Sequence, residues 1–125
     1  MLTGMRRIRV ADFQNAADDF EELLNSEPEY YLASLFHSVC FLKLKRPSEA
    51  EIGLTACIAQ RPRLYWNYFL RSQAYLEQGK SSFAVHDLKM VLELKPPFVV
   101  RSAAESLLRA AQSKITLSDN SPSVE

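Results

Sequence analysis

A chain of 125 residues is long enough for one domain with a shared core, and too short for two independent domains. Its fifteen Lys and Arg residues balance fifteen Asp and Glu residues, so no net charge favours binding to nucleic acid or to an anionic membrane. Three glycines and six prolines are too few for a turn-rich all-β protein, and the composition indicates helix.

Hydrophobic periodicity and helix-stop signals predict a chain that is helical from end to end. The opening segment MLTGMRRIRV is short and basic, and the last helical segment, FVVRSAAESLLRAAQSK, mixes apolar and charged residues. The polar tail TLSDNSPSVE is predicted to be disordered. In chain order, the predicted helices span about residues 1–10, 13–25, 30–44, 48–60, 64–78, 81–94 and 98–114.

The chain contains an internal repeat that is marked by three prolines. Pro28, Pro62 and Pro96 are spaced 34 residues apart, and each follows an apolar, helix-like segment. Proline lacks a backbone N–H and disfavours helix in the residue before it, so each one marks a helix end. Superposing the three segments aligns apolar positions along one helix face, and a small residue where two helices can approach closely. The aligned sets are Ala16, Ala50 and Ala84; Phe20, Leu54 and Leu88; Leu23, Cys57 and Val91; and Gly4, Ser38 and Ser72.

This 34-residue period, with its small–aromatic–Ala–large–small order and its terminal proline, resembles the tetratricopeptide repeat, a helix–turn–helix unit. The resemblance covers residues 31–98 as two full repeats, with a partial repeat at each end. Ser34 and Tyr68 stand where the family often has tryptophan, and Arg7 stands where the first repeat should have an aromatic residue. The resemblance implies an all-α fold: a right-handed α-α superhelix of helix hairpins with a C-terminal capping helix.

The repeat divides the chain into five parts. A repeat buries its apolar face only against its neighbours, so terminal repeats need a polar outer side. The incomplete first repeat offers little cover, and homodimerisation through it is one hypothesis. From the last helix, the residues expected to face inward are Val99, Ala103, Leu107 and Ala110. The predicted parts are a partial first repeat (1–30), a second repeat (31–64), a third repeat (65–98), the capping helix (99–114) and a disordered tail (115–125).

The resemblance also implies a groove for a ligand, because in the family the first helix of each repeat lines the concave face of the superhelix. Most of the corresponding residues here are apolar, and Trp and Phe side chains dominate binding energy when they enter pockets. The set lacks the Lys and Asn combination that clamps a terminal carboxylate in some family members, so the expected ligand is an apolar or amphipathic peptide or helix. The predicted groove residues are Leu32, Leu35, Val39, Leu42, Lys43, Trp66, Phe69, Gln73, Leu76 and Glu77, and the capping helix would add Val100, Ala103 and Leu107.

A stripe of aromatic residues at helical spacing is also typical of ordinary helix–helix cores. Trp66 and Phe69 therefore have a second interpretation, in which they pack against neighbouring helices. The sequence leaves both interpretations open.

No group of residues in the sequence indicates catalysis or metal binding. His37 and Cys40 lie one helical turn apart, but zinc needs three or four ligands and the other His and Cys lie in different repeats. His86 and Asp87 point about 100° apart on a helix, so we expect both to be solvated rather than paired. We therefore expect no enzyme activity, no cofactor and no metal.

The sequence thus predicts a non-enzymatic scaffold or adaptor that binds another protein or peptide. The alternative is a structural element that forms homodimers or stacked assemblies through open repeat ends. We expect a cytoplasmic protein without nucleic-acid or membrane partners, because no segment approaches the roughly 18 apolar residues of a membrane span and the basic opening leads into no apolar signal region. The segment YWNYFLRSQAYLEQGK is similar to repeat arrays of bacterial multidomain proteins, which suggests a bacterial source and a recruitment role.

Overall fold

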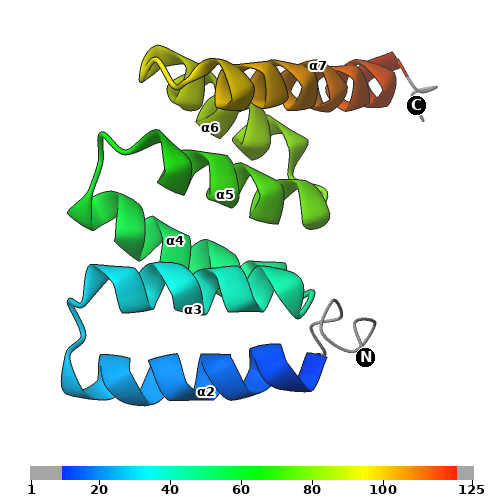
Figure 1. The fold of residues 1–125 in the computed structure, drawn as a ribbon. Coiled ribbons are helices and arrows are strands. Elements are labelled where there is room, and N and C mark those ends of the chain that lie inside the picture. Colours follow the sequence, from blue (N-terminus) through cyan, green and yellow to red (C-terminus); the bar gives the residue numbers. More distant parts are fainter. Residues whose placement is uncertain (1–9, 121–125) are drawn as a thin grey trace, which may run out of the picture.

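The computed structural model describes residues 10–120, which form six helices and no strand: α2 (Val10–Ser26), α3 (Tyr31–Lys43), α4 (Pro47–Gln60), α5 (Tyr65–Glu77), α6 (Ser81–Glu93) and α7 (Phe98–Asn120). The helices are stacked in chain order, with α2 at one end of the molecule and α7 at the other (Figure 1). Each helix packs mainly against its neighbours in the chain, apart from a small contact between α3 and α5. The predicted all-α array of helical hairpins is confirmed.

The turns inside the two complete hairpins have the same backbone geometry. Lys45 follows α3 with a φ of 61°, and Gly79, which lies 34 residues later, follows α5 with a φ of 76°. This left-handed conformation ends a helix by letting a later N–H bond back to the last turn. Accordingly, the N–H of Arg46 donates to the carbonyl of Phe41 and the N–H of Lys80 donates to the carbonyl of Tyr75, both at 2.9 Å. The 34-residue repeat therefore extends to the helix caps.

The two ends of the chain depart from the predicted helix bounds. The predicted first helix, residues 1–10, lies outside the described residues except for Val10, where α2 begins. Helix α7 continues to Asn120, past the expected end at residue 114 and into the segment that we expected to be disordered. No proline or glycine follows Pro97 until Pro122, so the chain contains no helix stop at residue 114. The remaining tail, residues 121–125, lies outside the described part.

The aligned apolar positions are fully buried in the second and third repeats. In each of α4 and α6, the three aligned apolar side chains of the repeat are 0% exposed. In α2 the corresponding stripe is only partly covered, and Leu23 is 37% exposed. A helix in the middle of the array is covered on two sides, whereas among the described residues α2 packs mainly on α3. The buried residues are Ala50, Leu54 and Cys57 in α4 and Ala84, Leu88 and Val91 in α6.

The face that α7 turns inward is shifted by one residue from the expected one. Val99 is 76% exposed, and Ala103 and Ala110 are also exposed, so these three inward assignments are wrong. Ala104 and Ala111 are fully buried instead. The other side chains that pack on this side are Val100, Leu107 and Leu108.

The small aligned residue of the second repeat, Ser38, lies where α3 and α4 approach closely. Ser38 and Ser72 are 1% and 0% exposed, as expected for residues that must be small. A Cβ atom added at Gly53 of α4 would overlap the Oγ of Ser38 and lie 3.4 Å from its Cβ. The Ser38 hydroxyl donates a hydrogen bond of 2.9 Å to the carbonyl of Ser34, so it cannot turn away without losing that bond.

Gly53→Ala is therefore expected to lower the free energy of unfolding by roughly 1 kcal/mol. Overpacking costs about 1–3 kcal/mol, and this exceeds the gain of about 1 kcal/mol that alanine normally gives in a helix. Urea denaturation of the two proteins measures the difference. In a Ser38→Gly background the same change should be stabilising, because the overlapping atoms are gone. A Gly53→Ala protein as stable as the unchanged chain would show that α3 and α4 are farther apart.

A buried ion pair joins α5 to α6. Asp87 is 1% exposed, and the guanidinium of Arg71 donates to both of its carboxylate oxygens, from Nε at 2.7 Å and from Nη2 at 2.9 Å. Arg71 also donates to the hydroxyl of Thr55 on α4 at 3.1 Å. The expectation that His86 and Asp87 are both solvated is wrong for Asp87, and the His86 side chain is 79% exposed. The sequence did not reveal this pair, because its two members lie in different helices.

Candidate functional site

A groove of about 450 Å³ runs between α3 and α5, the first helices of the two complete repeats. Both helices present residues spaced three or four positions apart, which places those side chains on one face. Five of the nine lining residues are apolar, and the other four are two lysines, a glutamine and a glutamate. The lining consists of Phe36, Val39, Leu42, Lys43 and Lys45 from α3 and its C-terminal turn, and Trp66, Leu70, Gln73 and Glu77 from α5.

Six of the ten residues that the resemblance assigns to the groove line this cavity. Of the others, Leu35 and Phe69 are each 8% exposed and belong to the two apolar clusters of the core. Leu32 is 49% exposed but lines a neighbouring cavity, and Leu76 is half-buried. The six that line the groove are Val39, Leu42, Lys43, Trp66, Gln73 and Glu77.

Three further residues line the groove although the family resemblance did not assign them to it: Phe36, Lys45 and Leu70. Phe36 is the most exposed aromatic residue of the lining, at 47%. It precedes Val39 by three residues and Lys43 by seven, so the helical spacing of the sequence could have placed it on the same face. The groove positions that the family resemblance implies include the adjacent Leu35 instead of Phe36, and Leu35 belongs to the core.

Two aromatic side chains on the groove are held in place by neighbouring rings. Trp66, which is 40% exposed, stacks on the buried ring of Phe69 with centroids 5.5 Å apart and planes 10° apart. Phe36 lies 6.0 Å from the ring of Phe20 on α2. A partner that covers these rings therefore needs to order few side chains, which reduces the entropy cost of binding.

The basic residues at one end of the groove are available to a partner. Lys43 and Lys45 are both exposed, and neither forms an ion pair within the described part of the chain. Glu77 is the one acidic residue in the lining. This end therefore suits an acidic group of a ligand that is otherwise apolar.

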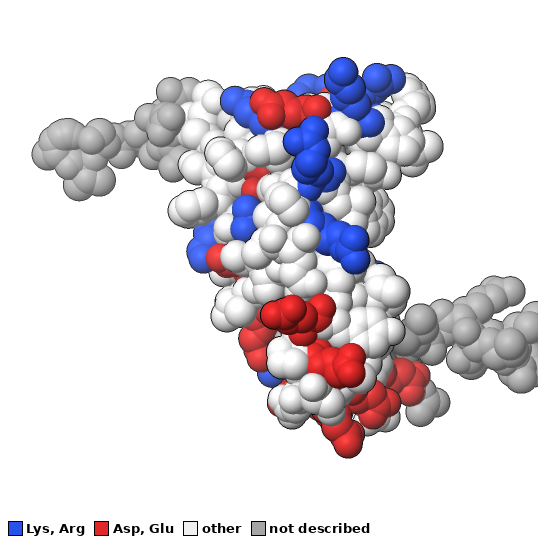
Figure 2. All heavy atoms as spheres, turned by 90° about the vertical axis from the view of Figure 1, so that its left-hand side faces the viewer, with Lys and Arg blue, Asp and Glu red and all other residues white. Residues whose placement is uncertain are grey.

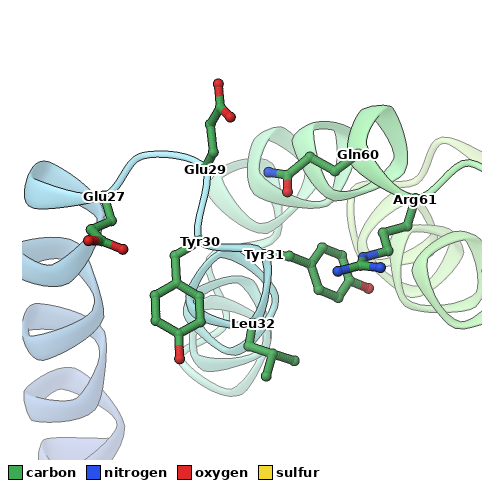
Figure 3. A pocket seen from close by; sticks show the side chains of 7 residues that line it. All are labelled: Glu27, Glu29, Tyr30, Tyr31, Leu32, Gln60 and Arg61. Carbon is green, nitrogen blue, oxygen red and sulfur yellow. The ribbon is translucent and has the colours of Figure 1, made fainter.

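A second cavity, of about 430 Å³, lies where α2 connects to α3 (Figure 3). The guanidinium of Arg61 lies over the ring of Tyr31, 4.7 Å from its centroid, and the Tyr31 hydroxyl donates to the Oδ1 of Asn67 at 2.7 Å. Burial raises the pKa of Tyr31. Asn67 is fully buried, and its amide donates to the carbonyls of Cys57 and Arg61, both at 3.4 Å. These contacts tie the start of α3 to α4 and α5.

His37 lies on α3 in a setting that disfavours its charged form. Its ring is 4.5 Å from the ring of Phe41, and its Nε2 is buried without a hydrogen-bond partner among the described residues. Desolvation by burial lowers the pKa of His37. The charged groups that act on it include the carboxylates of Asp18, Glu21 and Glu49, which raise its pKa, and Arg46, which lowers it.

The lowered pKa of His37 predicts a loss of stability in mild acid. Below about pH 6.5 the unfolded chain protonates its histidines, whereas folded His37 stays neutral until a lower pH. The unfolded state then binds more protons, so the free energy of unfolding decreases as the pH falls through this window. His37→Gln should flatten that dependence, measured by urea denaturation between about pH 7 and pH 5. His86→Gln is the matched control, and an equal effect of both changes would contradict the assignment to His37.

The two cysteines are packing residues rather than reactive groups. Cys40 and Cys57 are unpaired and buried. Burial raises the pKa of the Cys57 thiol to about 11 and also raises that of Cys40, so little reactive thiolate forms at neutral pH. Within residues 10–120, no three metal-ligating side chains lie close enough to hold an ion. None of the helices described is both long and apolar enough to cross a membrane.

Comparisons with known proteins agree with this architecture. No protein-family model matches the chain. A segment of 51 residues, 41% of the chain, is 43% identical to the tetratricopeptide repeat and J domain-containing co-chaperone DNJ1 of Fusarium oxysporum f. sp. lycopersici. The segment matched is only 10% of the length of that co-chaperone.

Solved structures resemble nearly the whole chain. The first TPR domain of human RPAP3 has a TM-score of 0.77 at 21% identity, covering 90% of this chain and 86% of that one. The first TPR of Spaghetti (RPAP3), bound to the HSP90 peptide SRMEEVD, gives a TM-score of 0.76, again at 21% identity, with 85% and 82% covered. The Yersinia enterocolitica type III secretion chaperone SycD, in complex with a peptide of the translocator YopD, gives 0.77 at 18% identity, with 83% and 82% covered. The 34-residue repeat, the stacked hairpins and these neighbours together show that this chain has the fold of a tetratricopeptide repeat array.

Proposed function

We propose that this chain is a non-enzymatic interaction module that holds an apolar or amphipathic segment of another protein in the groove between α3 and α5. The observation that carries the proposal is the pair of half-exposed aromatic rings, Phe36 and Trp66, on one cavity. Large exposed apolar side chains that gather on a concave surface mark binding sites in soluble proteins. Two structural neighbours contain a bound peptide, from HSP90 and from YopD, which supports the same use of the fold here.

The groove favours a ligand that is bound along its side chains rather than through a terminal carboxylate. Its lining combines five apolar residues with the exposed Lys43 and Lys45 at one end. We infer that the ligand places bulky apolar side chains against Phe36 and Trp66 and an acidic side chain near the two lysines. An amphipathic helix or an extended apolar segment with one flanking Asp or Glu meets these requirements.

The single tryptophan of the chain provides a direct assay. Trp66 is the sole Trp and lies in the groove lining, so its fluorescence reports occupancy. A library of amphipathic peptides, each about 15 residues long (roughly four helical turns), is screened for a change in this emission. Phe36→Ser is expected to lower the affinity for the selected peptides by at least about 10-fold, as truncation of a central aromatic anchor does.

Ile52→Ser is the matched control, because Ile52 is 72% exposed on α4 and lies outside the groove lining. It should leave the affinity unchanged. Leu35 and Phe69 are unsuitable for this test, since both are core residues and their loss would unfold the chain. Binding that survives Phe36→Ser, or peptides that bind without changing Trp66 emission, would contradict the groove assignment.

A further inference from the structure

One edge of the molecule is formed by the connections that join successive hairpins. The α2–α3, α4–α5 and α6–α7 connections, residues 27–30, 61–64 and 94–97, all lie on the same side of the stack (Figure 1). We call this side, with the adjoining helix ends, the connection edge. It follows from the fold, because alternate turns of a stack of antiparallel helices fall on the same side.

The α2 end of the connection edge is acidic and hollow. Glu27, Glu29 and Tyr30 line two adjacent open cavities, each of about 430 Å³, and Arg61 lines one of them. Tyr30 is 44% exposed. Residues 10–42 contain seven Asp and Glu residues and no Lys or Arg. Figure 2 faces this edge and shows acidic side chains gathered at its lower end.

The α7 end of the same edge is basic and projects apolar side chains. Phe98 and Val99 are 69% and 76% exposed, and the guanidinium of Arg101 lies over the Phe98 ring, 5.7 Å from its centroid. Residues 95–114 contain four Lys and Arg residues against one acidic residue, Glu105. Lysine and arginine side chains dominate the upper part of the edge in Figure 2. Exposed apolar side chains of this size, rimmed by charge, are typical of an interaction surface.

We propose that two copies of this chain pair antiparallel along their connection edges, about a twofold axis. In that arrangement Phe98 and Val99 of each copy enter the hollow beside Tyr30 of the other. Lys95 and Arg101 then face Glu27 and Glu29. The two patches lie at opposite ends of one side, so a twofold rotation makes both contacts at once and closes the pair. Stacking through open repeat ends would instead use the outer faces of the terminal helices.

The middle of the connection edge sets the register of the pairing. Arg63 lies on the α4–α5 connection, between the two patches, whereas Arg61, at the start of that connection, lines the hollow together with Glu27 and Glu29. In the proposed register Arg63 lies near the twofold axis, where its two copies repel each other. In a shifted register Arg63 would instead face Glu27 and Glu29 of the other copy, and the exposed Phe98 and Val99 would have no partner. The apolar match favours the proposed register, and Arg63→Glu distinguishes the two.

The test is analytical ultracentrifugation of the full chain at about 100 μM, at low salt and at about 0.5 M salt, where surface charges are screened. We expect a dimer that dissociates at high salt. Glu27→Arg with Glu29→Arg should raise the dimer dissociation constant at least ten-fold, and so should Lys95→Glu with Arg101→Glu. An equimolar mixture of the two double variants should restore the dimer, because every contact again joins opposite charges. Arg109→Glu with Lys114→Glu, which makes the same charge change farther along α7, should leave it intact.

Three results would overturn the pairing: a monomer at low salt, failure of the mixed variants to associate, or a mass that keeps growing with concentration, which indicates open stacking. Arg63→Glu should preserve or tighten the proposed dimer, and weakening would show the shifted register. The groove residues Phe36 and Trp66 are outside the exchanged charges, so an unchanged chain that is monomeric at low salt but still binds the selected peptides would reject this inference alone.

Discussion

Replacing Asp87 with alanine is expected to lower the free energy of unfolding by about 3–5 kcal/mol. The change removes the carboxylate that accepts two hydrogen bonds from Arg71 and leaves that guanidinium, whose side chain is 16% exposed, without its counter-charge. A guanidinium keeps its proton at neutral pH, so in the variant Arg71 remains charged without a partner. Urea denaturation followed by circular dichroism measures the loss.

Two further variants separate the ion pair from the loss of any acidic residue. Glu93→Ala removes an exposed carboxylate from the same helix and should change stability by at most about 0.5 kcal/mol. Asp87→Leu combined with Arg71→Met removes both charges, and should recover most of the loss because no unpaired charge remains buried. If Asp87→Ala costs no more than Glu93→Ala, the contact between Arg71 and Asp87 is not formed in solution.

The helices and their order could be predicted because their signals are local and repeated. Pro28, Pro62 and Pro96 mark helix ends through backbone sterics, which depend only on local sequence. The aligned residues of α4 and α6 are buried because the same hairpin packs the same way each time. The sequence also indicated why Ser38 must be small, and Gly53 now identifies the backbone that it approaches.

The face of α7 could not be chosen from the sequence, because its apolar residues occur as adjacent pairs. Val99 is followed by Val100, Ala103 by Ala104, Leu107 by Leu108 and Ala110 by Ala111. Two stripes one residue apart are therefore equally apolar, and both satisfy helical spacing. Packing against α6 selects the stripe of Ala104 and Ala111.

The groove could be located in general but not residue by residue. The choice between Leu35 and Phe36 depends on a rotation of about 100° about the axis of α3, which is set by packing on α2 and α4. The polar contacts of Asn67 and of Arg71 with Asp87 were missed for a related reason. Each joins helices that the chain connects only through a turn, and polar residues in a sequence are expected at the surface by default.

Leu54→Ala is expected to lower the free energy of unfolding by about 2–5 kcal/mol. Leu54 is 0% exposed in the apolar cluster that α3, α4 and α5 share, so the shorter side chain leaves a cavity in the middle of the array. Helices in a stack contact mainly their chain neighbours, and a defect in α4 therefore weakens the connection between the two halves. Amide hydrogen exchange should accelerate more in α3 and α4 than in α6 and α7.

Ile52→Ala provides the matched control, since Ile52 lies two residues away on the same helix and is 72% exposed. Truncating it should cost at most about 0.5 kcal/mol and leave the exchange pattern unchanged. Equal costs at Leu54 and Ile52 would mean that α4 is rotated relative to its neighbours. Uniform acceleration of exchange after Leu54→Ala would show instead that the stack unfolds as one cooperative unit, so that any partner bound between α3 and α5 stabilises α7 as well.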